Sequence, residues 1–105
     1  YIDAGADGIM IHSKKKEPGE IFEFCKEFSK FETKVPLIVV PTTYNAVYEQ
    51  ELCDMGVNLV IYANHMLRAA YPSMQKAAHS ILKNKRSYEL ENKISSVKEV
   101  INLIK

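Results

Sequence analysis

Residues 37–40, Leu-Ile-Val-Val, form a continuous apolar run that opens after Pro36 and is stopped by Pro41. Three of the four side chains are β-branched, which suits an extended strand. A strand whose side chains are all apolar needs cover on both faces, as in a parallel sheet with helices on its faces. The run therefore predicts a buried strand of an α/β protein.

Similar runs precede and follow this strand. Residues 8–12 (GIMIH) and 58–62 (NLVIY) are short, apolar and rich in β-branched side chains. After the three runs, apolar residues at intervals of three and four predict helices at 21–31, 46–55 and 65–83. Helices between successive strands require parallel strands with right-handed crossovers. Three such βα units in a row predict an α/β fold.

The first five residues resemble the last turn of a helix, with Gly5 at a left-handed C-cap position. We therefore expect the chain to be a piece of a longer protein. Three strands would also leave two open sheet edges, which natural proteins normally cover. The pattern predicts the last part of a barrel or of a doubly wound sheet.

Composition and charge argue against several functional classes. Fourteen Lys and Arg against thirteen Asp and Glu leave a net charge of +1, without the basic excess typical of nucleic-acid or acidic-membrane binding. The apolar runs are far shorter than the roughly 20 residues that span a bilayer, and the start does not resemble a secretory signal. Cys25 and Cys53 lie alone inside predicted helices, so we expect reduced core thiols in a cytoplasmic protein.

The last third of the chain differs from the repeats. Pro72 should kink or break the third helix, and the polar residues 83–93 suggest a linker or lid-like segment. Ser96 and Glu99 have capping-box spacing before a short apolar stripe. Nine residues cannot hold a helix alone, so we expect it to dock on its own barrel or on a neighbouring subunit. We divide the chain into residues 1–84, a partial barrel, and 85–105, a linker and terminal helix.

Chemistry in a parallel barrel occurs at the carboxyl ends of the strands. Three polar groups follow the strands here, at residues 12–14, 41–43 and 63–65. Strand alternation puts His12 on the face of Met10, with Ile9 and Ile11 packed on the helices. The same count puts Thr42 on the face of Val40 and Ile38, and Asn64 on the face of Tyr62 and Val60. No pair of acidic residues lies at a strand end, so we predict no metal site from this chain alone.

Each candidate residue also has a structural interpretation. His12 could be hydrogen-bonded within the fold or exposed, and Thr42 could cap a loop. Asn64 is a candidate N-cap of the long helix. Three adjacent lysines, residues 14–16, are more often a solvated turn than an anion site.

Four segments together resemble the phosphoenolpyruvate mutases of the isocitrate lyase and phosphoenolpyruvate mutase superfamily. They are residues 4–14 (AGADGIMIHSK), 39–44 (VVPTTY), 54–57 (DMGV) and 61–69 (IYANHMLRA), and residues 96–99 (SVKE) also resemble the end of such enzymes. The resemblance implies a (β/α)₈ barrel that interconverts phosphoenolpyruvate and phosphonopyruvate for phosphonate synthesis, with Mg²⁺.

The same resemblance suggests roles for individual residues. It implies a catalytic, substrate-contacting role for His12, and we extend substrate contacts to Ser13, Thr42 and Asn64. The family's metal ligands, its phosphoryl-binding arginine and its lid correspond to sequence before Tyr1, so we predict that the chain alone is inactive. Members commonly form oligomers, so we expect a homo-oligomer.

Several alternatives stay open. Phosphonopyruvate hydrolase, methylisocitrate lyase and oxaloacetase belong to the same superfamily and differ chiefly in sequence before Tyr1. A non-catalytic, truncated product that only oligomerises with a full-length partner is a different class of function.

Overall fold

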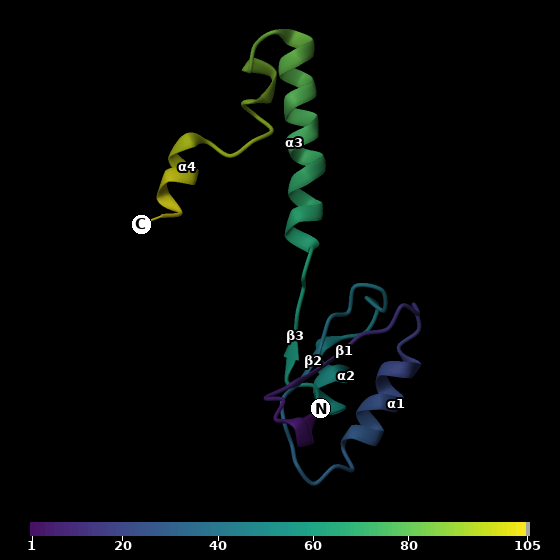
Figure 1. Cartoon of the computed structure of the whole chain (residues 1–105). Coiled ribbons are helices and arrows are strands. Elements are labelled where there is room, and N and C mark those ends of the chain that lie inside the picture. Colours follow the sequence, from purple (N-terminus) through teal and green to yellow (C-terminus); the bar gives the residue numbers. More distant parts are fainter. Residues whose placement is uncertain (105) are drawn as a thin grey trace. The chain divides into compact units, whose positions relative to one another are not determined.

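The structure, a computed structural model, describes residues 1–104 (Figure 1). Its elements, in chain order, are η1 (Ile2–Ala4), β1 (Ile9–Ile11), α1 (Gly19–Phe28), β2 (Leu37–Val39), α2 (Glu49–Asp54), β3 (Leu59–Val60), α3 (His65–Asn84), η2 (Tyr88–Leu90) and α4 (Val97–Asn102). They form two compact units, Tyr1–Ala63 and the part of the chain from Asn64 onward.

The first unit is built on a parallel sheet in the order β1-β2-β3. Met10 pairs with Ile38, which in turn pairs with Leu59. Three successive βα units therefore run in parallel, and the prediction of an α/β fold is confirmed. Each strand is only two or three residues long. Because β2 lies in the middle of the sheet, it is the one strand paired on both sides within the described residues.

The core of the first unit lies on one face of this sheet. Leu37 and Val39 of β2 are buried there together with side chains from α1, α2 and the loops between elements. On the opposite face Met10 is 64% and Leu59 51% exposed. The expectation that β2 would be covered on both faces holds for one face only, because this unit has no helix over the other.

Helix α1 places one side against the sheet. Ile21, Cys25 and Phe28 are buried at the expected helical spacing. The helix ends at Phe28, three residues earlier than predicted, so Phe31 lies outside it and is exposed, as is Phe24 in part.

Helix α2 is shorter than the sequence pattern suggests. It begins at Glu49, where the Tyr48 N–H donates to the Glu51 carboxylate at 2.9 Å, and it ends before Gly56, whose φ is 91°. Only Leu52 is buried in these six residues, and Cys53 next to it is exposed. The expectation of a core thiol is thus correct for Cys25 and wrong for Cys53, since adjacent helical residues point about 100° apart.

In the second unit α3 runs without a break through Pro72. Of the expected kink or break, the break is wrong, because a helix can lose the one bond that proline cannot make when the turns on both sides are intact. Its predicted apolar face is exposed within the described residues, with Met66 at 77%, Met74 at 58% and Ile81 at 44%.

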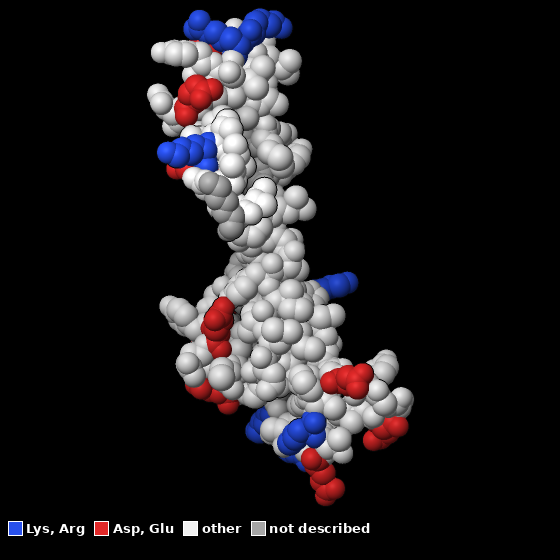
Figure 2. Space-filling model, turned by 90° about the vertical axis from the view of Figure 1, so that its left-hand side faces the viewer, with Lys and Arg blue, Asp and Glu red and all other residues white. Residues whose placement is uncertain are grey.

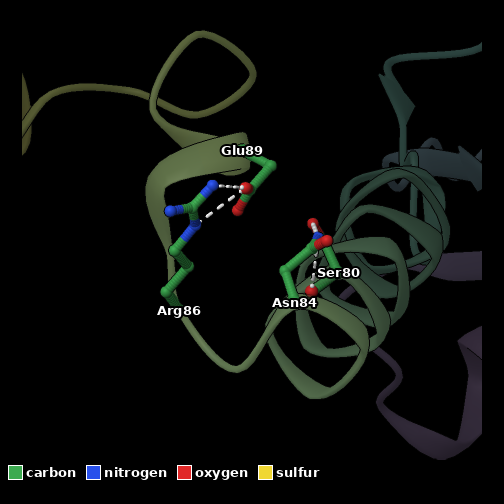
Figure 3. A network of polar contacts seen from close by, with 4 residues as sticks. All are labelled: Ser80, Asn84, Arg86 and Glu89. Carbon is green, nitrogen blue, oxygen red and sulfur yellow. Dashed lines mark hydrogen bonds and ion pairs between the residues drawn. The ribbon is translucent and has the colours of Figure 1, made fainter.

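The segment after α3 folds back on the end of that helix. Lys85 adopts a left-handed conformation with φ 56°, and Leu90 of η2 is buried. Figure 3 shows the polar contacts of this turn. Asn84 Nδ2 donates to the Ser80 carbonyl at 2.9 Å, and Arg86 donates to Glu89 through Nε and an Nη. These bonds lie within α3 and within the segment, respectively, and it is the buried Leu90 and the contacts between η2 and α3 that show the segment expected as a linker packing on α3.

The predicted capping box of α4 is confirmed. The Glu99 N–H donates to Ser96 Oγ at 3.2 Å, and the Glu99 carboxylate accepts from the Ser96 N–H at 2.7 Å. The apolar stripe of α4 (Val97, Val100, Ile101 and Ile104) is exposed within the described residues. Within the described residues the clearest support for this six-residue helix is therefore its cap.

Acidic and basic side chains are interspersed on each unit in the face that Figure 2 shows. Among residues 1–104 no helix combines the length and the apolar character needed to cross a membrane.

Candidate functional site

His12 and Thr42 follow neighbouring parallel strands, at the edge where ligands bind in α/β folds. His12 comes directly after β1 and is exposed, while Thr42 follows β2 and is half-buried. The His12 ring lies beside that of Tyr44, with ring centroids 6.4 Å apart and the planes tilted by 46°. Tyr44 is fully buried, so the exposed imidazole has a core aromatic ring as its neighbour.

Strand alternation in β1 agrees with the sequence pattern. Ile9 and Ile11 pack against the helix-side core, and Met10 points to the uncovered face. Ile38, paired with Met10, is half-buried on that same face.

Ser13 is the one polar residue that is buried among those described, with 4% exposed. Its hydroxyl donates to Glu20 Oε2 at 2.6 Å and accepts from the Lys15 N–H at 3.1 Å. Its carbonyl accepts from Thr43 Oγ1. The Ser13 side chain is therefore engaged within the fold at the position where a substrate contact was expected.

Glu20, in the first turn of α1, links this loop to the helix. Its carboxylate also pairs with Lys15 Nζ at 2.6 Å. The hydrogen bond from Lys15, and then that from Ser13, lower the pKa of Glu20, and the bond to Glu20 raises the pKa of Lys15. Both groups are thus held in their charged forms.

Two residues at this edge, Glu20 and Tyr44, were not candidates in the sequence, and Thr43 appeared there only as a member of the polar group 41–43. Glu20 and Thr43 lie seven and thirty residues from Ser13, their shared partner. Periodicity carries no signal for such contacts, because they depend on which loops become neighbours. The one available hint for Tyr44 was an aromatic residue in a loop directly after a buried strand.

Asn64 occupies the N-cap position of α3, the structural role considered for it, but its side chain makes no capping hydrogen bond. It belongs to the second unit. In the first unit Val60 pairs with Val39, which is fully buried on the helix side. β3 ends at Val60, so strand alternation assigns Asn64 to neither face of the sheet.

Two buried groups lie behind the site. Burial raises the pKa of the Cys25 thiol and of the Tyr44 hydroxyl. Both are therefore neutral at physiological pH, and the surface under His12 carries no charge.

The described residues do not fit a magnesium site. Within residues 1–104 no three His, Cys, Asp or Glu side chains lie close enough together to hold a metal ion. Mg²⁺ prefers carboxylate oxygens and water, and the carboxylate that contacts the loop after β1, that of Glu20, is already bonded to Ser13 and Lys15.

Residues 1–82 match the family model described as phosphoenolpyruvate phosphomutase, which covers more than three quarters of the chain. The chain belongs to the phosphoenolpyruvate phosphomutase family. The resemblance seen in the sequence is thereby confirmed.

Relatives of this phosphomutase-family chain are similar over almost all of it. It is 43% identical to a phosphoenolpyruvate phosphomutase of Tetrahymena pyriformis over 98% of the chain and 33% of the relative. It is 39% identical to a phosphonopyruvate hydrolase of Variovorax sp. (strain Pal2) over 98% of the chain and 35% of the relative. The chain thus spans about a third of the length of the curated relatives it matches.

Solved structures of the phosphomutase family share the fold. A crystal structure of phosphoenolpyruvate phosphomutase from Streptomyces platensis subsp. rosaceus aligns with a TM-score of 0.85 at 35% identity, over 98% of this chain and 35% of that one. A phosphonopyruvate hydrolase crystallised with oxalate and Mg²⁺ aligns with a TM-score of 0.83 at 39% identity, over 98% of this chain and 36% of that one.

Proposed function

We propose that this chain forms the carboxyl-terminal part of an enzyme that interconverts phosphoenolpyruvate and phosphonopyruvate, the entry step to phosphonate synthesis. The observation that carries the proposal is the 43% identity to the Tetrahymena phosphomutase over 98% of the chain. In this proposal residues 1–84 supply the last three βα units of a (β/α)₈ barrel, and residues 85–105 supply a linker and a terminal helix.

The exposed side of β1 supports the barrel. β1 is an edge strand in the described sheet, and a cleft of about 870 Å³ lies beside it. Its lining is largely apolar and includes Met10, Phe24 and Phe31. An open strand edge next to apolar side chains is suited to a further strand and helix of a barrel.

The reaction requires a phosphoryl group to leave the enol oxygen and bond to carbon. Anionic oxygens must be held throughout, so fixed hydrogen-bond donors at the substrate accelerate the step. His12 fits this role because its ring is exposed at the strand ends and rests on a buried, neutral aromatic ring. An imidazolium would hold anionic oxygens more strongly than a neutral imidazole.

The other proposed contacts are Ser13, Thr42 and Asn64. Thr42 is half-buried beside the strand ends. The Ser13 hydroxyl is bonded to Glu20, so a substrate contact there would require that bond to be exchanged. Asn64 follows the third strand at the start of α3.

Magnesium belongs to this proposal as a cofactor held by residues other than those described. A bound Mg²⁺ would supply positive charge for the enolate oxygen. Since the described residues form no such site, we expect the 105-residue chain by itself to have no turnover. We also propose a cytoplasmic homo-oligomer acting on a small-molecule substrate.

Phosphonopyruvate hydrolysis is the second candidate function. The Variovorax hydrolase is 39% identical over the same 98% of the chain, close to the value for the phosphomutase. The two reactions give different phosphorus products from phosphonopyruvate, because hydrolysis releases inorganic phosphate and the mutase reaction forms phosphoenolpyruvate.

A pair of chimeras tests the function. This chain would replace the matching third of the Tetrahymena phosphomutase and of the Variovorax hydrolase, and phosphorus NMR would follow phosphonopyruvate. We expect the phosphomutase chimera to retain activity within about tenfold of its parent and to exceed the hydrolase chimera in relative activity. His12→Ala in the active chimera should lower kcat by 10²-fold or more, as for a lost transition-state donor.

The controls separate the possible outcomes. The 105-residue chain alone should match the uncatalysed rate. A folded phosphomutase chimera without activity would contradict the proposal and favour the non-catalytic class. Higher relative activity in the hydrolase chimera would favour the second candidate.

A further inference from the structure

Ser13, Thr43, Glu20 and Lys15 form a cluster of contacts that we call the Ser13 clasp. It joins three parts of the first unit: the loop after β1, the loop after β2 and the first turn of α1. Glu20 and the Lys15 N–H bond to the Ser13 hydroxyl, and Thr43 bonds to the Ser13 carbonyl. The clasp is therefore a cross-link between the two loops that carry His12 and Thr42.

The clasp uses both hydrogen-bonding functions of the Ser13 hydroxyl. Oγ donates to the Glu20 carboxylate at 2.6 Å and accepts from the Lys15 N–H at 3.1 Å. A hydrogen bond to a charged group is about twice as strong as a neutral one. The hydroxyl of Ser13 makes both bonds from a buried position, where Ser13 is 4% exposed.

The backbone of Ser13 is held as well. Its carbonyl accepts from Thr43 Oγ1, thirty residues further along the chain. Tyr44, next to Thr43, is the residue on which the His12 ring lies. Ser13 follows His12 in the chain, and Thr43 precedes Tyr44. The hydrogen bond between Ser13 and Thr43 therefore links the two residues whose rings are in contact.

We propose that Ser13 is a positioning residue, which through Thr43 and Glu20 holds the His12 imidazole beside the Tyr44 ring at the carboxyl end of β1. A catalytic consequence of this positioning rests on the role proposed for His12. The position of the His12 ring itself depends on the clasp and can be measured without a substrate.

The test uses NMR on the 105-residue chain, with His12 ring signals assigned by comparison with His12→Gln. In the unmodified chain we expect nuclear Overhauser contacts between the His12 and Tyr44 rings and a ring-current shift of the His12 carbon-bound protons. Ser13→Ala should reduce those contacts at least twofold. Ser13→Thr should restore them, because threonine keeps the hydroxyl.

The matched control is Ser29→Ala. Ser29 Oγ donates to the Lys26 carbonyl at the exposed end of α1. The substitution therefore removes a serine hydroxyl from the same unit but outside the clasp. We expect unchanged His12 signals in this variant.

A folded Ser13→Ala chain with unchanged His12–Tyr44 contacts would overturn the proposal. If Ser13→Ala does not fold, Thr43→Val decides, because it removes only the bond to the Ser13 carbonyl. The same loss of contacts is expected there, and unchanged contacts would overturn the proposal. Failure of the chimera assay alone would leave the positional result standing, so the two failures are distinguishable.

Discussion

The two cysteines show how a single residue's surroundings set its chemistry. Cys25 is 1% exposed in the core behind the sheet, and burial raises the pKa of its thiol. Cys53 is exposed on α2. Since the thiolate is the reactive form, burial and the raised pKa both slow the reaction of Cys25, and the exposed Cys53 is the accessible nucleophile.

We predict that Cys53 reacts with an aromatic disulfide reagent at least ~10-fold faster than Cys25 at neutral pH. The absorbance of the released thiol would show one fast and one slow equivalent for each chain. Cys53→Ser should remove the fast phase and leave the slow one. Equal rates for the two thiols in the native chain would contradict the burial of Cys25.

Among the elements, α4 depends most clearly on local sequence. It has six residues, too few for helix propensity to maintain it. Its apolar stripe is exposed, so within the described residues its stability comes mainly from the reciprocal hydrogen bonds between Ser96 and Glu99.

Ser96→Ala should therefore lower the stability of α4 by about 1 kcal/mol, roughly a fivefold drop in the ratio of helix to coil. Carbon chemical shifts of residues 97–102 would measure the change. Ser95→Ala is the matched control, because it removes the adjacent hydroxyl and keeps the cap. Equal effects of the two substitutions would show that the capping box is not what supports the helix.

At the scale of the whole molecule, much apolar surface is uncovered. Met10 and Leu59 lie exposed on one face of the sheet. The stripe of α4 and the apolar face of α3 are exposed in the second unit. Burying a large apolar side chain contributes roughly 1.5–3 kcal/mol, so surfaces of this size favour association.

We predict that the isolated chain self-associates, and that Met10→Lys with Leu59→Lys weakens the association at least tenfold. Sedimentation over a concentration series would measure it. Gln50→Lys is the control for added positive charge, because Gln50 is exposed on α2 away from this sheet face. A chain that stays monomeric at all concentrations would contradict the prediction.

The sequence by itself determined the local elements and the family. Periodicity located the three βα units, Gly5 and Gly56 marked stops that adopt positive φ, and Ser96 with Glu99 marked a cap that forms. These features depend on neighbours within a few residues, so the pattern in the chain contains them.

Only the tertiary structure decided which distant residues meet. The register pairs Val60 with the buried Val39, and Thr43 reaches the carbonyl of Ser13 thirty residues away. It also put Cys53 in solvent and Ser13 in the interior. The physical reason is that burial and long-range hydrogen bonds depend on how the strands and loops pack against one another, which helical or strand periodicity does not encode.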